Sequence, residues 1–305
     1  RHSSRSLYPT NGKRRYPPSK VDVFEVYRRM ATPLGYITWS VPPDLQLGHF
    51  TVHLYGLLFA VGLFAGGLVV IALMKQYKTS QSYLIYAFLG IIIGARLFHC
   101  VFYDPYYYLA HWQEVLLPVV VDNDGGLRFS GFWGFASHGG VIGLMVALYI
   151  FCRRNNVGYL AICDVFAIAT PITGAFIRLG NLMNSEILGK PADISTAFVF
   201  TNVDNVPRYP ANLYEALWYF VLFAVLWLWY KKKGFASYKS GFYTGVAFLG
   251  VAVFRFFIEF IKEDQEKYIN ALPLNMGQLL SIPFVVAGVI LVWYCSRRED
   301  TNQVR

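Results

Sequence analysis

The chain has 305 residues, of which 55% are hydrophobic, 18% aromatic and only 15% charged, and its mean hydropathy is +0.40. Soluble domains usually carry about 25% charged residues, and disordered chains are poor in aromatics, so this composition excludes disorder and argues against an ordinary soluble globule. It predicts a multi-pass membrane protein. The formal net charge of +9 would fit nucleic-acid binding only if the basic residues formed one patch of the fold.

The beginning of the chain is strongly basic. Residues 1–29 hold eight basic and two acidic side chains, contain no apolar run of the kind found in a secretory signal peptide, and are followed directly by Met30. We interpret residues 1–29 as a basic leader that is disordered or not native. A basic tail that contacts lipid headgroups is the alternative. Residues 30–305 are expected to form a single transmembrane domain.

Seven apolar runs follow, and each has the length of about 20 residues that a membrane-crossing helix needs. They cover residues 54–74, 82–103, 131–152, 157–177, 212–230, 241–261 and 275–295. Small residues four apart, such as Gly62 with Gly66 and Gly90 with Gly94, predict close contacts between helices. We therefore expect an all-α integral membrane protein with seven transmembrane helices.

Basic residues mark alternate connections between the runs. The first, third and fifth connections carry clusters of Lys and Arg, namely Lys75, Lys78, Arg153, Arg154, Lys231, Lys232, Lys233 and Lys239. By the positive-inside rule, the N-terminus lies outside and the C-terminus lies in the cytoplasm. Residues 104–130 and 178–211 then form external loops, and we expect the second of them to build a small external cap between helices 4 and 5. A positive charge distributed in this way does not indicate a nucleic-acid partner.

Polar side chains inside the runs gather near the outer ends, where such costly groups usually serve a function. They are His53, Tyr55, Arg96, His138, Arg178, Tyr214, Glu215, Arg255, Glu259, Asn275 and Gln278. This common depth predicts one cavity open to the outer leaflet, whereas a conduction path would need polar groups along the whole span. Asp164 lies in the inner part of the fourth run, and we expect it to hydrogen-bond to a neighbouring helix.

Three of these residues, Arg96, Arg178 and Arg255, predict the class of ligand. Guanidinium groups bind phosphate in a forked geometry, and the outer leaflet offers the phosphate of an anionic phospholipid. Arg255 and Glu259 are four residues apart, so they are expected to form an internal ion pair or to let the carboxylate orient the arginine. Arg96 alone could snorkel to the interface. No metal or cofactor is expected, because no Asp/His/Cys cluster has ligand spacing.

The densest polar string, IRLGNLMNSEILG, runs from Ile177 to Gly189. A capped helix end would be its structural explanation, but the string also resembles the signature of the prolipoprotein diacylglyceryl transferases. Six further blocks resemble the motifs of that family in the same order: HLYG (53–56), GARLFHCVFY (94–103), SHGGVIG (137–143), RYPANLYE (208–215), FRFFIEF (254–260) and NMGQLLSIP (275–283). The resemblance extends from about residue 50 to residue 295.

The chain departs from the family pattern at a few positions. Ile177 replaces a glycine, Tyr209 and Asn212 replace a histidine and a glutamine, and Val251 replaces a tyrosine. His99 stands where the family often has tyrosine, and the segment before His138 is longer. The polar residues His138, Arg178, Asn181, Asn184, Glu186, Arg255 and Glu259 remain intact.

The resemblance implies a bacterial transferase that moves the diacylglyceryl group from phosphatidylglycerol to the lipobox cysteine thiol of a prolipoprotein, the first step of lipoprotein maturation. It implies an inner (plasma) membrane location with the active site toward the outer, periplasmic leaflet. A thiolate nucleophile calls for a base, and we expect His138 in that role; a core histidine hydrogen-bonded across helices is the alternative. Arg178 and Arg255 would stabilise the leaving phosphate. The substrate-binding candidates are Tyr55, Arg96, Asn181, Asn184, Glu186, Gly189, Tyr214, Glu215 and Glu259.

Three other functions compete with this interpretation. A lipid-binding or receptor-like protein would keep the outer cavity but release no glycerol phosphate. A transporter would need polar groups at the midplane and usually has internal repeats, neither of which the sequence displays apart from Asp164. A hydrolase of another class would need strings such as G-x-S-x-G or H-E-x-x-H, and the sequence contains neither.

Overall fold

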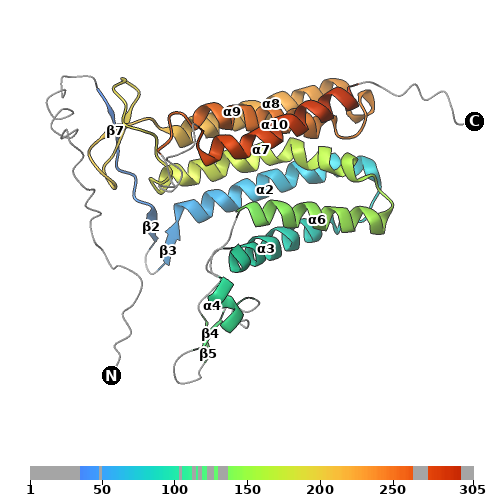
Figure 1. Cartoon of the computed structure of the whole chain (residues 1–305), viewed down its shortest axis with the longest axis horizontal. Helices are drawn as coiled ribbons and strands as arrows, with labels where there is room; N and C mark the ends of the chain where they lie inside the picture. Colours follow the sequence, from blue (N-terminus) through green and yellow to red (C-terminus); the bar gives the residue numbers. More distant parts are fainter. Residues whose placement is uncertain are drawn as a thin grey trace, which may run out of the picture.

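The computed structural model describes residues 35–47, 50–102, 105–111, 115, 119–121, 127–129, 137–263 and 274–296. Long helices dominate these residues and run side by side across the view of Figure 1. They are α2 (Leu54–Met74), α3 (Tyr83–Phe102), α6 (Ser137–Asn155), α7 (Tyr159–Met183), α8 (Ala211–Lys233), α9 (Phe242–Ile258) and α10 (Met276–Cys295). Each coincides with one predicted apolar run. The expected leader, residues 1–29, and the expected helical residues 131–136 lie outside the described part.

Five of these helices are long and apolar enough to cross a membrane, namely α2, α3, α7, α8 and α10. The apolar helix α9 has 17 residues, and the described part of α6 ends in the polar residues Arg153, Arg154 and Asn155. Short 3-10 turns, Lys75–Tyr77 and Phe235–Ser237, follow α2 and α8. The chain is therefore a mostly helical, multi-pass membrane protein.

Helix α7 lies at the centre of the bundle, where it contacts α2, α6, α8 and α9, while α3 packs on α6 and α9 on α10. The glycine pairs explain two of these contacts. A Cβ on Gly62 would lie 2.8 Å from the Cβ of Phe176 on α7, and a Cβ on Gly94 would overlap the carbonyl oxygen of Gly139 on α6. The small residues thus permit the close helix contacts that their spacing predicts.

Asp164 on α7 caps the N-terminus of α9. Its carboxylate accepts hydrogen bonds from the backbone N–H groups of Gly241 and Thr244 and from the Thr244 hydroxyl, each 2.7 Å long. The first N–H groups of a helix lack partners within the helix, and Gly241, the residue before α9, has no side chain to cap them. Asp164 supplies that cap from a neighbouring helix, so the expectation of an interhelical hydrogen bond is confirmed.

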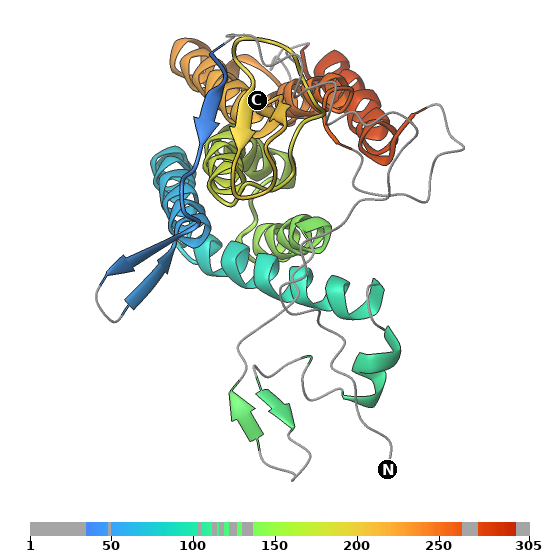
Figure 2. The same cartoon turned by 90° about the vertical axis from the view of Figure 1, so that its left-hand side faces the viewer.

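The strands gather at one end of the bundle, and Figure 2 views the protein from that side. Two of the pairs are hairpins: β2 (Asp44–Leu47) with β3 (Phe50–His53), and β4 (Val119–Val121) with β5 (Leu127–Phe129). A short helix, α4 (Pro105–Ala110), follows α3. A three-stranded sheet combines β1 (Ile37–Trp39), β6 (Phe198–Phe200) and β7 (Pro207–Arg208), with β6 in the middle.

This sheet belongs to the cap that the sequence predicts between α7 and α8. Strand β1 pairs in parallel with β6, so a segment that precedes α2 completes the cap. Phe198 and Phe200 pack with Leu182 at the end of α7, which fixes the cap to the bundle. Helix α7 itself continues to Met183 rather than ending near residue 177. Arg178 and Asn181 consequently lie on a helix and not in the loop.

Candidate active site

The candidate site begins on the last turns of α7, at the strand end of the bundle. Arg178 donates a hydrogen bond of 3.1 Å to the amide oxygen of Asn181, and Asn181 donates one of 2.7 Å to the carboxylate of Glu186. Asn212, in the first turn of α8, donates to the backbone carbonyl of Glu186. Glu186 therefore acts on Arg178 through Asn181, and the polar string of the sequence forms one connected hydrogen-bond chain.

A tyrosine from another helix lies against this chain. The ring of Tyr55, near the start of α2, is so close to α7 that a Cβ on Gly180 would lie 2.9 Å from it. Tyr55 also interacts electrostatically with Arg178 and Glu186. The glycine in the R-x-G-N string thus has a physical reason, because any side chain there would push Tyr55 away from Arg178.

Glu215 on α8 is the direct ionic partner of Arg178. The Arg178 Nε lies 3.3 Å from Glu215 Oε2, and Glu215 has no exposed surface. Tyr219, one turn further along α8, interacts electrostatically with both Arg178 and Arg255. A buried carboxylate next to an arginine holds the guanidinium in one place and compensates part of its charge.

Lys262, shortly after the end of α9, adds a second cation to Glu215. Its Nζ lies 3.4 Å from Glu215 Oε1 and 3.8 Å from Glu259 Oε2, and only 5% of the residue is exposed. Burial lowers the pKa of Lys262, while Glu215 and Glu259 oppose that shift. The side chain of Glu259 also packs on Gly277 at the start of α10, where a Cβ would overlap the carboxylate.

Arg255 is the exception among the charged side chains of the site. Within the described residues its guanidinium makes no ion pair, and Glu259 pairs with Lys262 instead. The internal Arg255–Glu259 pair that the spacing suggests is therefore not formed. We call Arg178, Glu215, Arg255, Glu259 and Lys262 the ionic cluster. It combines three cations with two carboxylates, so it carries one uncompensated positive charge.

The loop after α7 holds an unusual backbone conformation. Ser185 and Ile187, on either side of Glu186, have φ angles of 51° and 55°. Left-handed backbone is costly for a β-branched residue such as Ile187 and persists only where the surroundings enforce it. Gly189 then donates a backbone hydrogen bond to Tyr209, and a Cβ at Gly189 would overlap Tyr209. Gly189, a candidate for substrate binding, thus has a packing role in the structure.

Arg208 connects the cap to the loop that follows α7. The residue is buried and pairs with Asp204 at 2.7 Å and with Glu263 at 3.2 Å. It also donates a hydrogen bond to the carbonyl oxygen of Gly189. The cap, the loop after α7 and the segment after α9 are thereby held together beside the ionic cluster.

The remaining candidates lie around this centre or away from it. Asn184 is exposed and caps the end of α7 through its backbone, and Tyr214 is half-buried in the first turn of α8. Arg96 on α3 donates hydrogen bonds to Tyr108 and to the carbonyl oxygen of Val115, and none of its described contacts reaches Arg178. His138 lies in the first turn of α6, but its side chain is outside the described part.

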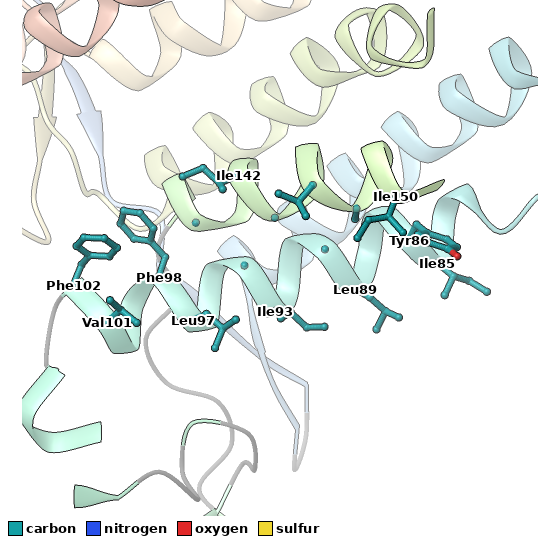
Figure 3. Close-up of a pocket in the computed structure, with 16 residues that line it drawn as sticks. Ile85, Tyr86, Leu89, Ile93, Leu97, Phe98, Val101, Phe102, Ile142 and Ile150 are labelled. Carbon is teal, nitrogen blue, oxygen red and sulfur yellow. The ribbon is translucent and has the colours of Figure 1, made fainter. Parts of the chain in front are cut away.

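A groove of about 560 Å³ is lined by residues of both α3 and α6. Figure 3 shows its wall of apolar side chains, including Leu97, Phe98 and Phe102 from α3 and Ile142 from α6. No charged residue lines the groove. The ionic cluster on α7, α8 and α9, rather than this groove, therefore has the chemistry to bind a phosphate.

The comparisons with known proteins decide the family. The sequence profile of the family described as prolipoprotein diacylglyceryl transferase matches residues 42–294. The chain belongs to this family. It is 46% identical over 271 residues to the phosphatidylglycerol–prolipoprotein diacylglyceryl transferase of Bacteroides fragilis. The aligned region covers 87% of this chain and 98% of the relative. It is also 41% identical over 292 residues to the protein of the same name from Porphyromonas gingivalis, with 88% and 98% covered.

Two residues of the site in this diacylglyceryl transferase family member were not expected from its sequence. In the sequence, Lys262 is one of several charged residues in a loop of mixed charge. Only its spacing of three residues from Glu259 suggests an ion pair. Tyr219 reads as one of many aromatic residues on α8, although it is four residues from Glu215. Both signals are weak because they depend on where three separate helices meet.

Proposed function

We propose that this chain transfers the diacylglyceryl group of phosphatidylglycerol to the cysteine thiol of a prolipoprotein lipobox. The products would be a thioether-linked lipid and glycerol phosphate. Membership of the prolipoprotein diacylglyceryl transferase family supports the reaction. The observation that carries the proposal is the ionic cluster, in which Arg255 has no carboxylate partner among the described residues and lies beside the ion pair of Arg178 with the buried Glu215.

The reaction forms one bond and breaks one bond. The thiol sulfur attacks the glycerol carbon that bears the phosphate, and the bond between that carbon and the phosphate oxygen breaks. The electron pair leaves with glycerol phosphate, and the thiol proton goes to a base. Negative charge therefore grows on the phosphate in the transition state, where preorganised donors are most effective.

We assign the phosphate to Arg178 and Arg255. The hydrogen bond to Asn181 and the ion pair with Glu215 orient Arg178, so it need not reorganise during the reaction. Arg255 forms no ion pair with a described residue, so we expect its guanidinium to bind phosphate oxygens in the forked geometry that arginine favours. Tyr55 and the exposed Asn184 are assigned to the headgroup, at the rim of the site.

We assign His138 as the base that takes the thiol proton. Its position at the start of α6 places its backbone at the same end of the bundle as the strands. The adjacent Gly139 and Gly140 are buried against α3, where a Cβ on Gly139 would overlap Phe98, so they fix the position of this helix start by close packing. A histidine has an unperturbed pKa near 6.5, which suits proton transfer at neutral pH.

We infer seven membrane spans, an external N-terminus and a cytoplasmic C-terminus. The basic side chains Lys231, Lys232 and Lys233 end α8, at the opposite end of that helix from Glu215. Arg153 and Arg154 likewise precede α7, whose other end carries Arg178. With these basic ends in the cytoplasm, the ionic cluster faces the outer leaflet of the bacterial plasma membrane.

The direct test uses the full chain in phosphatidylglycerol vesicles with a synthetic lipobox peptide. The expected result is a peptide whose mass increases by one diacylglyceryl group, together with an equal amount of glycerol phosphate. Vesicles of phosphatidylcholine serve as the control lipid. A lipid-binding protein without transferase activity would bind phosphatidylglycerol but leave the peptide mass unchanged, and that result would overturn the proposal.

A further inference from the structure

Lys262 has no role in the reaction proposed above. It lies in the short segment after α9, and its backbone forms an isolated β-bridge with Gly189 in the loop after α7. The ammonium group lies between the carboxylates of Glu215 and Glu259 and is almost fully buried. A buried lysine between a buried carboxylate, Glu215, and a partly buried one, Glu259, is costly to assemble, so we looked for a role of this arrangement beyond packing.

The consequence concerns Arg255. Arg255 and Glu259 are four residues apart at the end of α9, a spacing at which opposite charges on a helix pair readily. Glu259 instead rests on Gly277 with its carboxylate toward Lys262, and Arg255 makes no ion pair among the described residues. Lys262 therefore competes with Arg255 for the same carboxylate.

We propose that Lys262 is a positioning residue for the phosphate site: it holds Glu215 and Glu259 and thereby keeps Arg255 free for the phosphate of the lipid. Lys262 also supplies the charge by which the cations of the ionic cluster outnumber its carboxylates. The inference rests on the proposed transferase function. It predicts that the apparent affinity for an anionic phospholipid depends on Lys262 more strongly than the rate of the chemical step does.

The protonation of Lys262 provides a readout that packing alone would not affect. The charged groups that face it are Arg178 on α7, Glu215 on α8, and Arg255 and Glu259 on α9. Burial and the two arginines lower the pKa of Lys262, and the two carboxylates raise it, with a net shift below the ordinary value of lysine. As the pH rises through this lowered pKa, the ammonium loses its charge and releases Glu259. The KM for phosphatidylglycerol should then rise on the alkaline side.

The experiment measures kcat and KM for phosphatidylglycerol with the full chain in mixed vesicles. Lys262→Met should raise KM about tenfold or more, with a smaller effect on kcat, because it removes one partner of a buried charge pair. Lys262→Arg should keep a KM near that of the unmodified chain and move the alkaline rise in KM to higher pH. Lys190→Met is the matched control, since the side chain of this exposed lysine donates a hydrogen bond to the carbonyl oxygen of Phe260 and forms no ion pair with a described residue.

A double variant separates positioning from folding. In Lys262→Met/Glu259→Gln the carboxylate that would capture Arg255 is neutral, so KM should return toward the unmodified value. An unchanged KM in Lys262→Met, or an alkaline rise that does not move in Lys262→Arg, would overturn the inference. So would a double variant with a KM no better than that of Lys262→Met. If the unmodified chain transfers no diacylglyceryl group at all, the proposed function fails instead.

Discussion

The Nε of Arg178 lies 3.3 Å from the carboxylate of Glu215, a side chain with no exposed surface. This contact joins α7 to α8 and defines where the guanidinium lies before any lipid binds. The same carboxylate also faces Lys262, so one buried acid serves two cations from different segments. The arrangement makes Glu215 the centre of the ionic cluster, although the sequence indicated it only as one of several substrate-binding candidates.

Replacing Glu215 tests this central position. Glu215→Gln keeps the size of the side chain but removes the charge, so Arg178 and Lys262 lose their common partner. We expect kcat to fall by tenfold or more, and the free energy of unfolding to drop by about 3 kcal/mol, because buried cations are left uncompensated. Asp193→Asn in the exposed part of the cap is the control. Normal kinetics in Glu215→Gln would contradict the assignment.

Replacing Asp164 should affect stability rather than catalysis. Asp164→Ala removes three hydrogen bonds at the start of α9 and leaves two backbone N–H groups without their cap. We expect a loss of about 2 kcal/mol in the free energy of unfolding, seen as a lower Tm in detergent. Thr244→Val, which removes one of these bonds, should cost about 1 kcal/mol. A large change in KM with an unchanged Tm would contradict this structural role.

Gly189 offers a test of the loop that follows α7. Gly189→Ala places a methyl group against Tyr209, so the loop and the cap must separate. We expect the transferase activity to fall by tenfold or more, because the loop carries Glu186 and, through Asn181, supports Arg178. Gly67→Ala is the matched control, since a Cβ at that position meets nothing within 4 Å. Equal activities of the two variants would show that the loop tolerates the methyl group.

His138 is tested through the pH dependence of the rate. His138→Asn should lower kcat by about 10²-fold or more at neutral pH with little change in KM for the lipid, because only proton removal is impaired. The residual rate should increase with pH, since a free thiol ionises near pH 8.5 without help. Equal activity of the variant and the unmodified chain at every pH would remove His138 as the base.

Much of the fold could be predicted from the sequence, because the thickness of a bilayer fixes the length of the apolar helices that cross it. The seven long helices in the described part of the chain coincide with apolar runs, and the expected contacts of Gly62 and Gly94 are present. The cap was expected between α7 and α8, but one of its strands, β1 (Ile37–Trp39), precedes α2 in the chain. No local sequence pattern predicts that β1 pairs with β6, because the two strands are far apart in the sequence.

The sequence predicted which residues belong to the site better than it predicted which of them pair with one another. Arg178, Asn181 and Glu186 lie in one string and form one hydrogen-bond chain. The spacing of Arg255 and Glu259 suggested an ion pair, but Lys262 takes the carboxylate. Which of two cations captures a carboxylate depends on helix packing, here on Gly277 of α10, and helical spacing alone does not determine it.

The guanidinium of Arg255, which has no carboxylate partner in the described part of the chain, is the central feature of the proposed phosphate site, and one measurement tests it most directly. Arg255→Ala should lower the rate of diacylglyceryl transfer to a lipobox peptide in phosphatidylglycerol vesicles by about 10²-fold or more. Its Tm should stay close to that of the unmodified chain, because Arg255 makes no ion pair within the described residues. Undiminished transfer by a correctly inserted Arg255→Ala protein would contradict the account.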